Sequence, residues 1–264
     1  MRTFTIKSKN SKSIKIFLNF SILIFWIFIW EVLFKAIGQE ILIVSPKDVF
    51  FNVFVLSGKI SFWKTIFFST SRIILGFTLA VALGVFLASL SAKFKAFLWF
   101  IKPLFTVIKS TPVASFVVLT LVFIKSAYLP IFISFLMVLP IVWNNVLEGI
   151  RKVDTKLIDL GKVFKFSKFT YLFKIYVPSV FPYFSSAIAT GLGFAWKSGI
   201  AAEIIANTKL SIGSEIYDSK IYLDTLNLFS WTLVVVIMSL LLEKIISALF
   251  CRMTKKYGFN KNLQ

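Results

Sequence analysis

Histidine is absent from this chain, and cysteine occurs once, as Cys251. These absences exclude a haem or zinc site built on histidine, an iron–sulfur cluster, and a Ser–His or Cys–His nucleophile pair. No disulfide can form within the chain. Acidic residues are also scarce, with 11 Asp and Glu against 30 Lys and Arg, and no clustered carboxylates mark a catalytic site. We therefore expect a protein that is not an enzyme and that needs no cofactor or metal.

Apolar residues dominate the sequence instead. They make up 58% of its 264 residues, 32 of them are phenylalanine, and the mean hydropathy is +0.87, whereas soluble domains are about 45–50% apolar. Runs long enough to cross a bilayer occupy residues 16–36, 73–92, 97–124, 128–147, 178–206 and 227–250. We predict an all-α, multi-pass protein of the lipid bilayer with six transmembrane helices. The first run is too long for a signal peptide, so we expect a retained anchor, and Pro112 in "KSTPVAS" predicts a break in the third.

The basic residues indicate how these helices are oriented. A net charge of +19 would ordinarily suggest a nucleic-acid partner. The charges, however, cluster before the first span, between the fourth and fifth spans, and after the sixth. The positive-inside rule then places both termini and residues 148–177 in the cytoplasm of a cell-membrane protein, and no nucleic-acid partner is expected.

Three regions follow from these spans. Residues 1–60 comprise a cytoplasmic tail, the first helix and an external loop. Residues 61–250 form the transmembrane domain, with a cytoplasmic loop at 151–176. Residues 251–264 form a basic cytoplasmic tail.

The cytoplasmic loop has a helical pattern of its own. Leu157, Leu160, Gly161 and Phe164 fall at positions i, i+3, i+4 and i+7, which places them on one stripe of a helix. Apolar residues at 168–176 predict a second short helix. Two functions remain open for such lysine-rich amphipathic helices: they lie on anionic lipid, or they dock into a groove of a cytoplasmic partner.

The fifth span carries two charges, Lys197 and Glu203, among small residues. Six positions rotate a helix by about 600°, so these two side chains lie about 120° apart and cannot share a face. A charge inside a membrane faces protein or a water-filled path. Lys197, Glu203, Gly193 and Ser198 are thus candidates for lining a translocation pathway, with Lys197 attracting an anionic solute in its outer half. A structural salt bridge and ordinary helix packing are the alternatives.

The spacing of the loop resembles a known signature. Permeases of binding-protein-dependent ABC importers carry E-A-A-x3-G-x9-I-x-L-P in a cytoplasmic loop. Here Asp159, Leu160 and Gly161 are followed at the same spacing by Lys165 and by "IYVP", which ends in Pro178. Further segments are similar to the nitrate, sulfonate and taurine branch of that family: "VSPKDV" at 44–49, "STSRIILGF" at 69–77, "EGIRKVD" at 148–154, "AAEIIA" at 201–206 and "SIGSEIYDSK" at 211–220.

The resemblance implies the type I ABC importer permease fold, with a coupling helix that fits a cleft on the ATPase subunit. It assigns ATPase coupling to Asp159, Leu160, Gly161, Phe164, Lys165 and Pro178. It also implies three kinds of protein partner: a cytoplasmic ATPase dimer, an extracytoplasmic solute-binding protein and a second permease copy. The chain has no G-x-x-x-x-G-K-[ST] motif, so ATP hydrolysis is expected on the separate subunit.

The implied function is import of a small anionic or zwitterionic solute, such as nitrate, a sulfonate, taurine or a vitamin precursor. An ion-coupled secondary transporter is the alternative, although such folds usually contain inverted repeats and none is evident here. One departure from the signature affects local structure, because Lys165 replaces a glycine that allows a left-handed turn. We expect the turn to shift within "KFSK" at 165–168.

Overall fold

The computed structural model describes residues 11–257, and every regular element within that part is a helix. The all-α prediction is therefore confirmed. Of the predicted tails, residues 1–10 and 258–264 lie outside the described residues, whereas residues 251–257 of the predicted C-terminal tail continue the last long helix. The elements are α1 (Ser11–Ile37), α2 (Pro46–Ser57), α3 (Ile60–Lys93), α4 (Lys95–Ser110), α5 (Val113–Leu121), the 3₁₀ turn η1 (Ser126–Tyr128), α6 (Leu129–Arg151), α7 (Thr155–Val163), α8 (Lys168–Tyr171), the π-helical turn η2 (Leu172–Tyr176), α9 (Val177–Ile205), α10 (Ile212–Ile221) and α11 (Thr225–Tyr257).

Within residues 11–257, four helical segments are long and apolar enough to cross a membrane. They lie in α1, in α3, in η1 together with α6, and in α11. A fifth span results if α4 and α5 count as one, although the two are bent by 100° at the break between them. Pro112 directly precedes α5, so the predicted break of the third span is confirmed.

The remaining predicted span, residues 178–206, is the 29-residue helix α9. At about 1.5 Å per residue it is long enough to cross a bilayer, but it is not among the segments with sufficient apolar content. Its glycines, serines, Lys197 and Glu203 lower that content. The helix lies inside the bundle, where neighbouring helices rather than lipid cover most of its surface.

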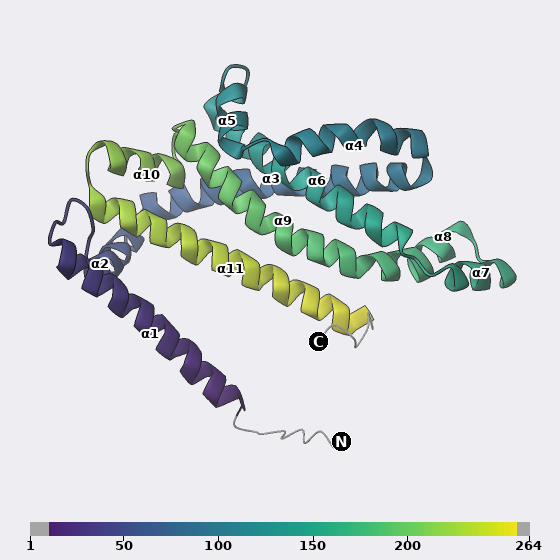
Figure 1. Ribbon diagram of the computed structural model, residues 1–264, viewed down its shortest axis with the longest axis horizontal. Helices are drawn as coiled ribbons and strands as arrows, with labels where there is room; N and C mark the ends of the chain where they lie inside the picture. Colours follow the sequence, from purple (N-terminus) through teal and green to yellow (C-terminus); the bar gives the residue numbers. More distant parts are fainter. Residues whose placement is uncertain (1–10, 258–264) are drawn as a thin grey trace.

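The centre of the bundle is formed by α3, α6 and α9, which pack side by side (Figure 1). Small residues bring their backbones together, because a Cβ added at Gly76 of α3 would overlap the backbone of Ile131 on α6. A Cβ at Gly199 of α9 would lie 2.5 Å from Ile73 on α3. Helices in lipid associate through such close contacts, because lipid tails are as apolar as the side chains and the hydrophobic effect therefore does not drive helices together.

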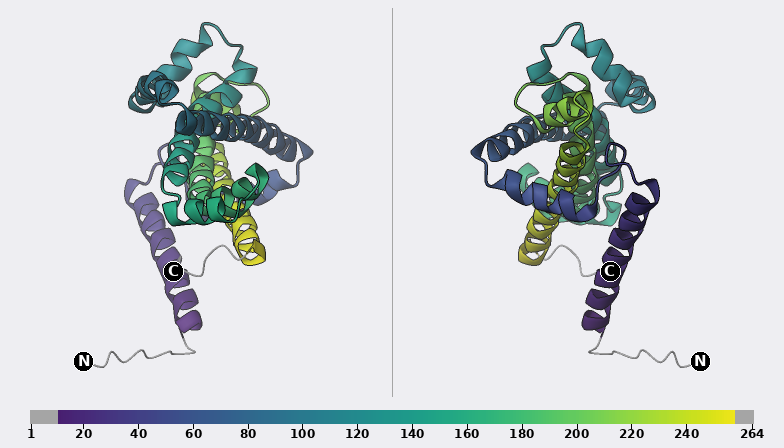
Figure 2. Two further views of the ribbon diagram at one scale, coloured as in Figure 1. Left: turned by 90° about the vertical axis from the view of Figure 1, so that its right-hand side faces the viewer. Right: turned by 90° about the vertical axis from the view of Figure 1, so that its left-hand side faces the viewer.

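The two ends of the bundle carry different short helices. α7 and α8 lie at one end, and α2 and α10 lie at the other (Figure 1). α1 stands away from the other long helices (Figure 2). It is joined to the end of the bundle that carries α2 and α10 by Trp30, whose indole N–H donates to the Val44 carbonyl at 3.0 Å. From there α1 runs back in the direction of α7 and α8, as α11 does (Figure 1).

Candidate functional site

The two helices expected in the cytoplasmic loop are both present, and each begins at a side-chain cap. The Asp154 carboxylate accepts a hydrogen bond from the Lys156 backbone N–H at 2.9 Å at the start of α7. The Ser167 hydroxyl accepts from the Thr170 N–H at 3.3 Å at the start of α8. Such caps satisfy backbone donors that the first turn leaves free. α8 then continues through η2 into α9, whose first turn contains Pro178, so no flexible linker separates the loop from the bundle.

The turn between α7 and α8 stays at Lys165, so the expected shift within residues 165–168 is wrong. Lys165 adopts φ of +48°. Its N–H donates to the Lys162 carbonyl at 3.0 Å, and the Phe166 N–H donates to the Gly161 carbonyl at 2.9 Å. These two bonds form a Schellman motif, which satisfies carbonyls at the end of α7. The motif holds a lysine in a conformation that costs an L-residue about 1–2 kcal/mol.

Gly161 is the contact point between the two short helices. A Cβ there would lie 2.8 Å from Cζ of Tyr171. The Tyr171 hydroxyl also donates to the Ile158 carbonyl at 3.1 Å. The ring of Tyr171 thus rests on the backbone of α7, and the hairpin is held by packing as well as by its turn.

The predicted apolar stripe of α7 is largely uncovered. Leu160 is 52% exposed and Phe164 is 69% exposed, while Leu157 is also exposed. Asp159 lies off this stripe and pairs with Lys162 at 2.8 Å. That hydrogen bond and the carboxylate charge raise the pKa of Lys162 above its ordinary value. The end of the bundle therefore presents an apolar surface with charged residues beside it.

The candidate pathway residues of α9 separate into two groups. Lys197 is exposed and forms no ion pair within residues 11–257, and Gly193 has open space beside it. Together with Ala189, which is also exposed, they form a line at intervals of four positions that we term the open face of α9. Ser198 is buried, and its hydroxyl donates to the Phe194 carbonyl at 2.7 Å. Glu203 is fully buried.

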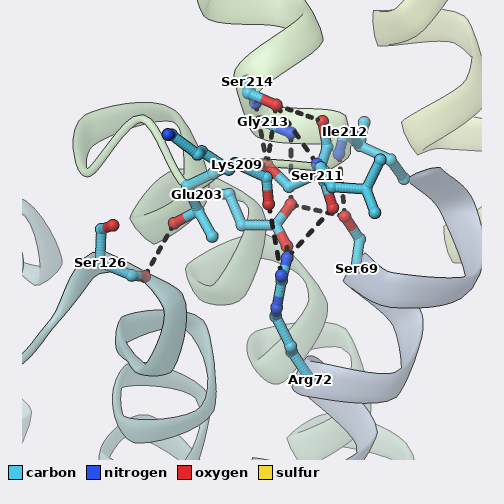
Figure 3. Close-up of polar contacts among 11 residues, drawn as sticks. Ser69, Arg72, Ser126, Glu203, Lys209, Ser211, Ile212, Gly213 and Ser214 are labelled. Atoms are coloured by element: carbon cyan, nitrogen blue, oxygen red, sulfur yellow. Dashed lines mark hydrogen bonds and ion pairs between the residues drawn. The ribbon is translucent and has the colours of Figure 1, made fainter.

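Glu203 is the centre of a polar cluster that joins α9, α3 and the start of α10 (Figure 3). The Ser69 hydroxyl donates to Oε2 of Glu203 at 2.8 Å, and the Gly213 backbone N–H donates to the same oxygen at 3.2 Å. Ser69 in turn accepts from the Ile212 N–H at 2.8 Å. Arg72 approaches the other carboxylate oxygen at 3.8 Å. Glu203 therefore pairs with a residue of another helix, as in the structural salt bridge that was the alternative to a pathway role.

Arg72 is a member of this cluster that the sequence did not single out. Its guanidinium also donates to the carbonyls of Leu210 at 3.2 Å and Lys209 at 3.3 Å. A basic residue at the edge of an apolar run was the available signal, because an intramembrane carboxylate needs a cationic or hydrogen-bonding partner. The segment before α10 is thus attached to the bundle through Arg72, Ser69 and Glu203.

Among residues 11–257, no group of three or more His, Cys, Asp or Glu side chains could hold a metal ion. The polar cluster around Glu203 consists of one ion pair and several hydrogen-bond donors, as a structural salt bridge does. It lies where α9 ends and α10 begins, far from α7 and α8 (Figure 1).

Comparison with known proteins gives consistent matches. The family model described as "Binding-protein-dependent transport system inner membrane component" matches residues 80–256. The bicarbonate transport system permease protein CmpB of Synechococcus elongatus is 30% identical over 162 residues, which cover 60% of this chain and 57% of that protein. The nitrate import permease protein NrtB of a Synechocystis species is 30% identical over 156 residues, covering 58% and 56%. A probable ABC transporter permease protein of Brucella melitensis is 26% identical over 224 residues, covering 84% and 90%. The match to CmpB and NrtB thus spans less than two thirds of their length.

Proposed function

Because the chain belongs to the family of binding-protein-dependent transport system inner membrane components, we propose that it is the permease subunit of an ATP-binding-cassette importer. The observation that carries this proposal is the uncovered apolar stripe of α7, presented on a rigid hairpin at one end of the bundle. In the proposed complex this end faces the cytoplasm, and α7 is the coupling helix. ATP is hydrolysed on a separate subunit, and an extracytoplasmic protein delivers the solute.

The stiffness of the hairpin favours a protein partner over lipid. A helix that only rests on a membrane surface needs amphipathic character, but it needs neither a Schellman turn nor a buried glycine contact. Here the lysine turn and the Gly161–Tyr171 contact keep α7 in one orientation, and η2 connects it directly to α9. A rigid connection of this kind transmits a displacement of α7 to the centre of the bundle.

The apolar stripe can also supply binding energy to a partner. Leu160 and Phe164 are more than half exposed. Full burial of such side chains contributes about 1.5–3 kcal/mol each, so completing the burial of both adds about 2–3 kcal/mol. The line of two exposed apolar residues one turn apart fits a helix docked in a protein groove.

The open face of α9 supports an anionic solute. We propose that this face lines the pathway between two copies of the chain, with Lys197 contributing positive potential in its outer half. Lys197 has no partner within residues 11–257, so its charge is available to a solute. A positive charge in a low-dielectric cleft raises the local concentration of anions. The names of two relatives, a bicarbonate and a nitrate permease, agree with a small inorganic anion.

Photo-crosslinking tests the coupling assignment. A photoreactive amino acid at Leu160 is expected to capture the ATPase subunit in membranes that contain the whole transporter. The matched control places the same group at Leu79, which is 50% exposed on α3 and is expected to capture lipid. Capture of lipid alone at Leu160, with the ATPase present, would refute the coupling role.

Transport measurements test the pathway assignment. With the transporter reconstituted in liposomes, Lys197→Met is expected to lower nitrate or bicarbonate uptake about tenfold through loss of electrostatic attraction. Lys47→Met removes an exposed lysine of α2 and serves as the control. Equal uptake by the Lys197 variant and the unaltered protein, at equal assembly, would contradict a pathway role for this lysine.

A further inference from the structure

A cavity lies at the end of the bundle opposite α7 and α8. Its volume is 320 Å³, and residues of α2, α3, α10 and α11 line it. Figure 1 shows α2 and α10 at this end, beside the first turns of α3 and α11. The cavity is separate from the open face of α9 and from the Glu203 cluster, because Lys197, Glu203 and Arg72 are absent from its lining.

The outer wall of the cavity is acidic. Glu215 and Asp218 lie three positions apart on α10, and neither side chain has an ion pair or hydrogen bond within the described residues. Asp224 also lines the cavity, but both of its oxygens accept from Asn227, at 3.0 Å from the backbone N–H and 2.6 Å from Nδ2. Lys59 is the one basic residue in the described lining. The wall therefore has excess negative charge.

The floor of the cavity contains two polar groups that have no hydrogen bond to the described part of the protein. Thr65 is 2% exposed and Trp231 is 3% exposed. Neither the Thr65 hydroxyl nor the Trp231 indole N–H has a hydrogen bond to any described residue. The other two buried tryptophans do: Trp143 donates to Ser91 at 2.9 Å, and Trp196 donates to the Val235 carbonyl at 3.1 Å.

Because both side chains line the cavity, their donors face its open volume, where water or a ligand can accept from them. The ring of Trp231 also lies 5.1 Å from that of Phe62, so the floor is aromatic as well as polar. It offers hydrogen-bond donors to an oxygen atom.

We propose that this cavity binds a small organic ammonium group that carries an oxygen acceptor, as in an amino alcohol. The ammonium group lies between Glu215, Asp218 and the aromatic pair, and the oxygen accepts from Trp231 and Thr65. The same chemistry occurs in free ethanolamine and in the ethanolamine headgroup of a phospholipid. A bare metal ion fits less well, because residues 11–257 contain no acidic cluster of the size that coordinates one.

The electrostatics of α10 agree with this assignment. Burial, and then repulsion from Asp218, raises the pKa of Glu215 above its ordinary value. A bound cation would offset both effects, because it stabilises the charged carboxylate.

Calorimetric titration of ethanolamine into the full-length protein tests the proposal. The protein is embedded in nanodiscs of phosphatidylglycerol, which has no amine. Asp218→Asn is expected to weaken binding about tenfold, because one of two unpaired carboxylates is removed. Trp231→Phe keeps an aromatic ring but removes the N–H, and should weaken binding about threefold to tenfold. Asp48→Asn, an exposed acid of α2 outside the cavity, should have no effect.

The same titration in phosphatidylethanolamine nanodiscs separates the two sources. If ethanolamine still binds in phosphatidylethanolamine nanodiscs, the cavity is assigned to a free amino alcohol. If ethanolamine no longer binds there, the lipid headgroup occupies the cavity. Absence of binding in phosphatidylglycerol nanodiscs overturns the proposal. Binding that Asp218→Asn leaves unchanged overturns it as well. Neither result bears on the coupling role of α7, which the crosslinking experiment tests separately.

Discussion

Replacing Arg72 with methionine tests whether a buried ion pair holds together the end of the bundle that carries α10. Arg72 is the only described basic residue that pairs with Glu203, at 3.8 Å, and the carboxylate is fully buried. The oxygen that faces Arg72 has no hydrogen-bond partner within the described residues. Methionine keeps much of the volume and apolar stem of arginine but removes its charge and its donors.

The magnitude follows from what Glu203 retains. Removing one partner of a buried ion pair costs about 3–5 kcal/mol, since the other charge stays buried. Here Ser69 and Gly213 still donate to the carboxylate, and the Arg72 side chain is 18% exposed, so we expect the lower end, about 3 kcal/mol. Glu203→Gln removes the charge but keeps a side chain of equal size, and we expect it to cost about 1–2 kcal/mol.

The assay combines unfolding and hydrogen exchange in detergent micelles. Denaturant unfolding measures the free energy lost in each single variant and in the double variant. If the pair interacts directly, the double variant should lose about 2 kcal/mol less than the sum of the single losses. Amide hydrogens of α10 should exchange about 100-fold faster in the Arg72 variant, which is the same 3 kcal/mol expressed as local opening.

Lys209→Met is the matched control. Its side chain is exposed, and only its backbone carbonyl contacts Arg72, so its effect should stay within about 0.5 kcal/mol. The ion-pair interpretation fails if the Arg72 variant unfolds like the unaltered protein. It also fails if the losses of the two single variants are additive.

Four further substitutions test local features. Lys165→Gly should stabilise the protein by about 1 kcal/mol, seen as a higher thermal unfolding temperature, because glycine adopts positive φ without strain; a lower temperature would contradict the turn geometry. Gly213→Ala should destabilise the protein by about 1–3 kcal/mol, because the added Cβ would overlap the end of α9. Gly193 has open space beside it, so Gly193→Ala is the control and should have little effect on the unfolding midpoint. Asp218→Asn should lower the pKa of Glu215, because repulsion from the Asp218 charge contributes to the rise of that pKa. Infrared titration of isotope-labelled glutamate measures the change. An unaltered pKa would show that burial alone raises it.

The membrane helices and the family were predictable because their signals are local or depend on spacing. Lengths of apolar sequence predicted the long helices, and Pro112 predicted the break in the third span. The order from Asp159 to Pro178 predicted a binding-protein-dependent permease, and the family match over residues 80–256 confirms that resemblance. The predicted number of six spans is not reached by length and apolar content together: within the described residues four segments qualify, or five if α4 and α5 count as one, and α9 is long enough but not apolar enough.

The geometry of the α7–α8 turn was not predictable from propensity. A lysine has no intrinsic preference for positive φ, which led to the expectation that the turn would move. The structure keeps Lys165 in place because the two Schellman bonds and the Gly161–Tyr171 contact act together. Tertiary packing thus outweighs a local preference of about 1–2 kcal/mol.

Composition and spacing alone determined that this chain is a helical membrane protein, that residues 151–176 form two short helices, and which family it belongs to. These properties depend on residues close in sequence, whose helical periodicity and hydropathy can be read directly. Only the tertiary structure decided that Arg72 meets Glu203 across 131 positions, that Ser198 faces inward while Lys197 does not, and that Thr65 and Trp231 share a cavity floor. Helical periodicity shows which residues share a face, but packing between helices distant in sequence decides what that face contacts.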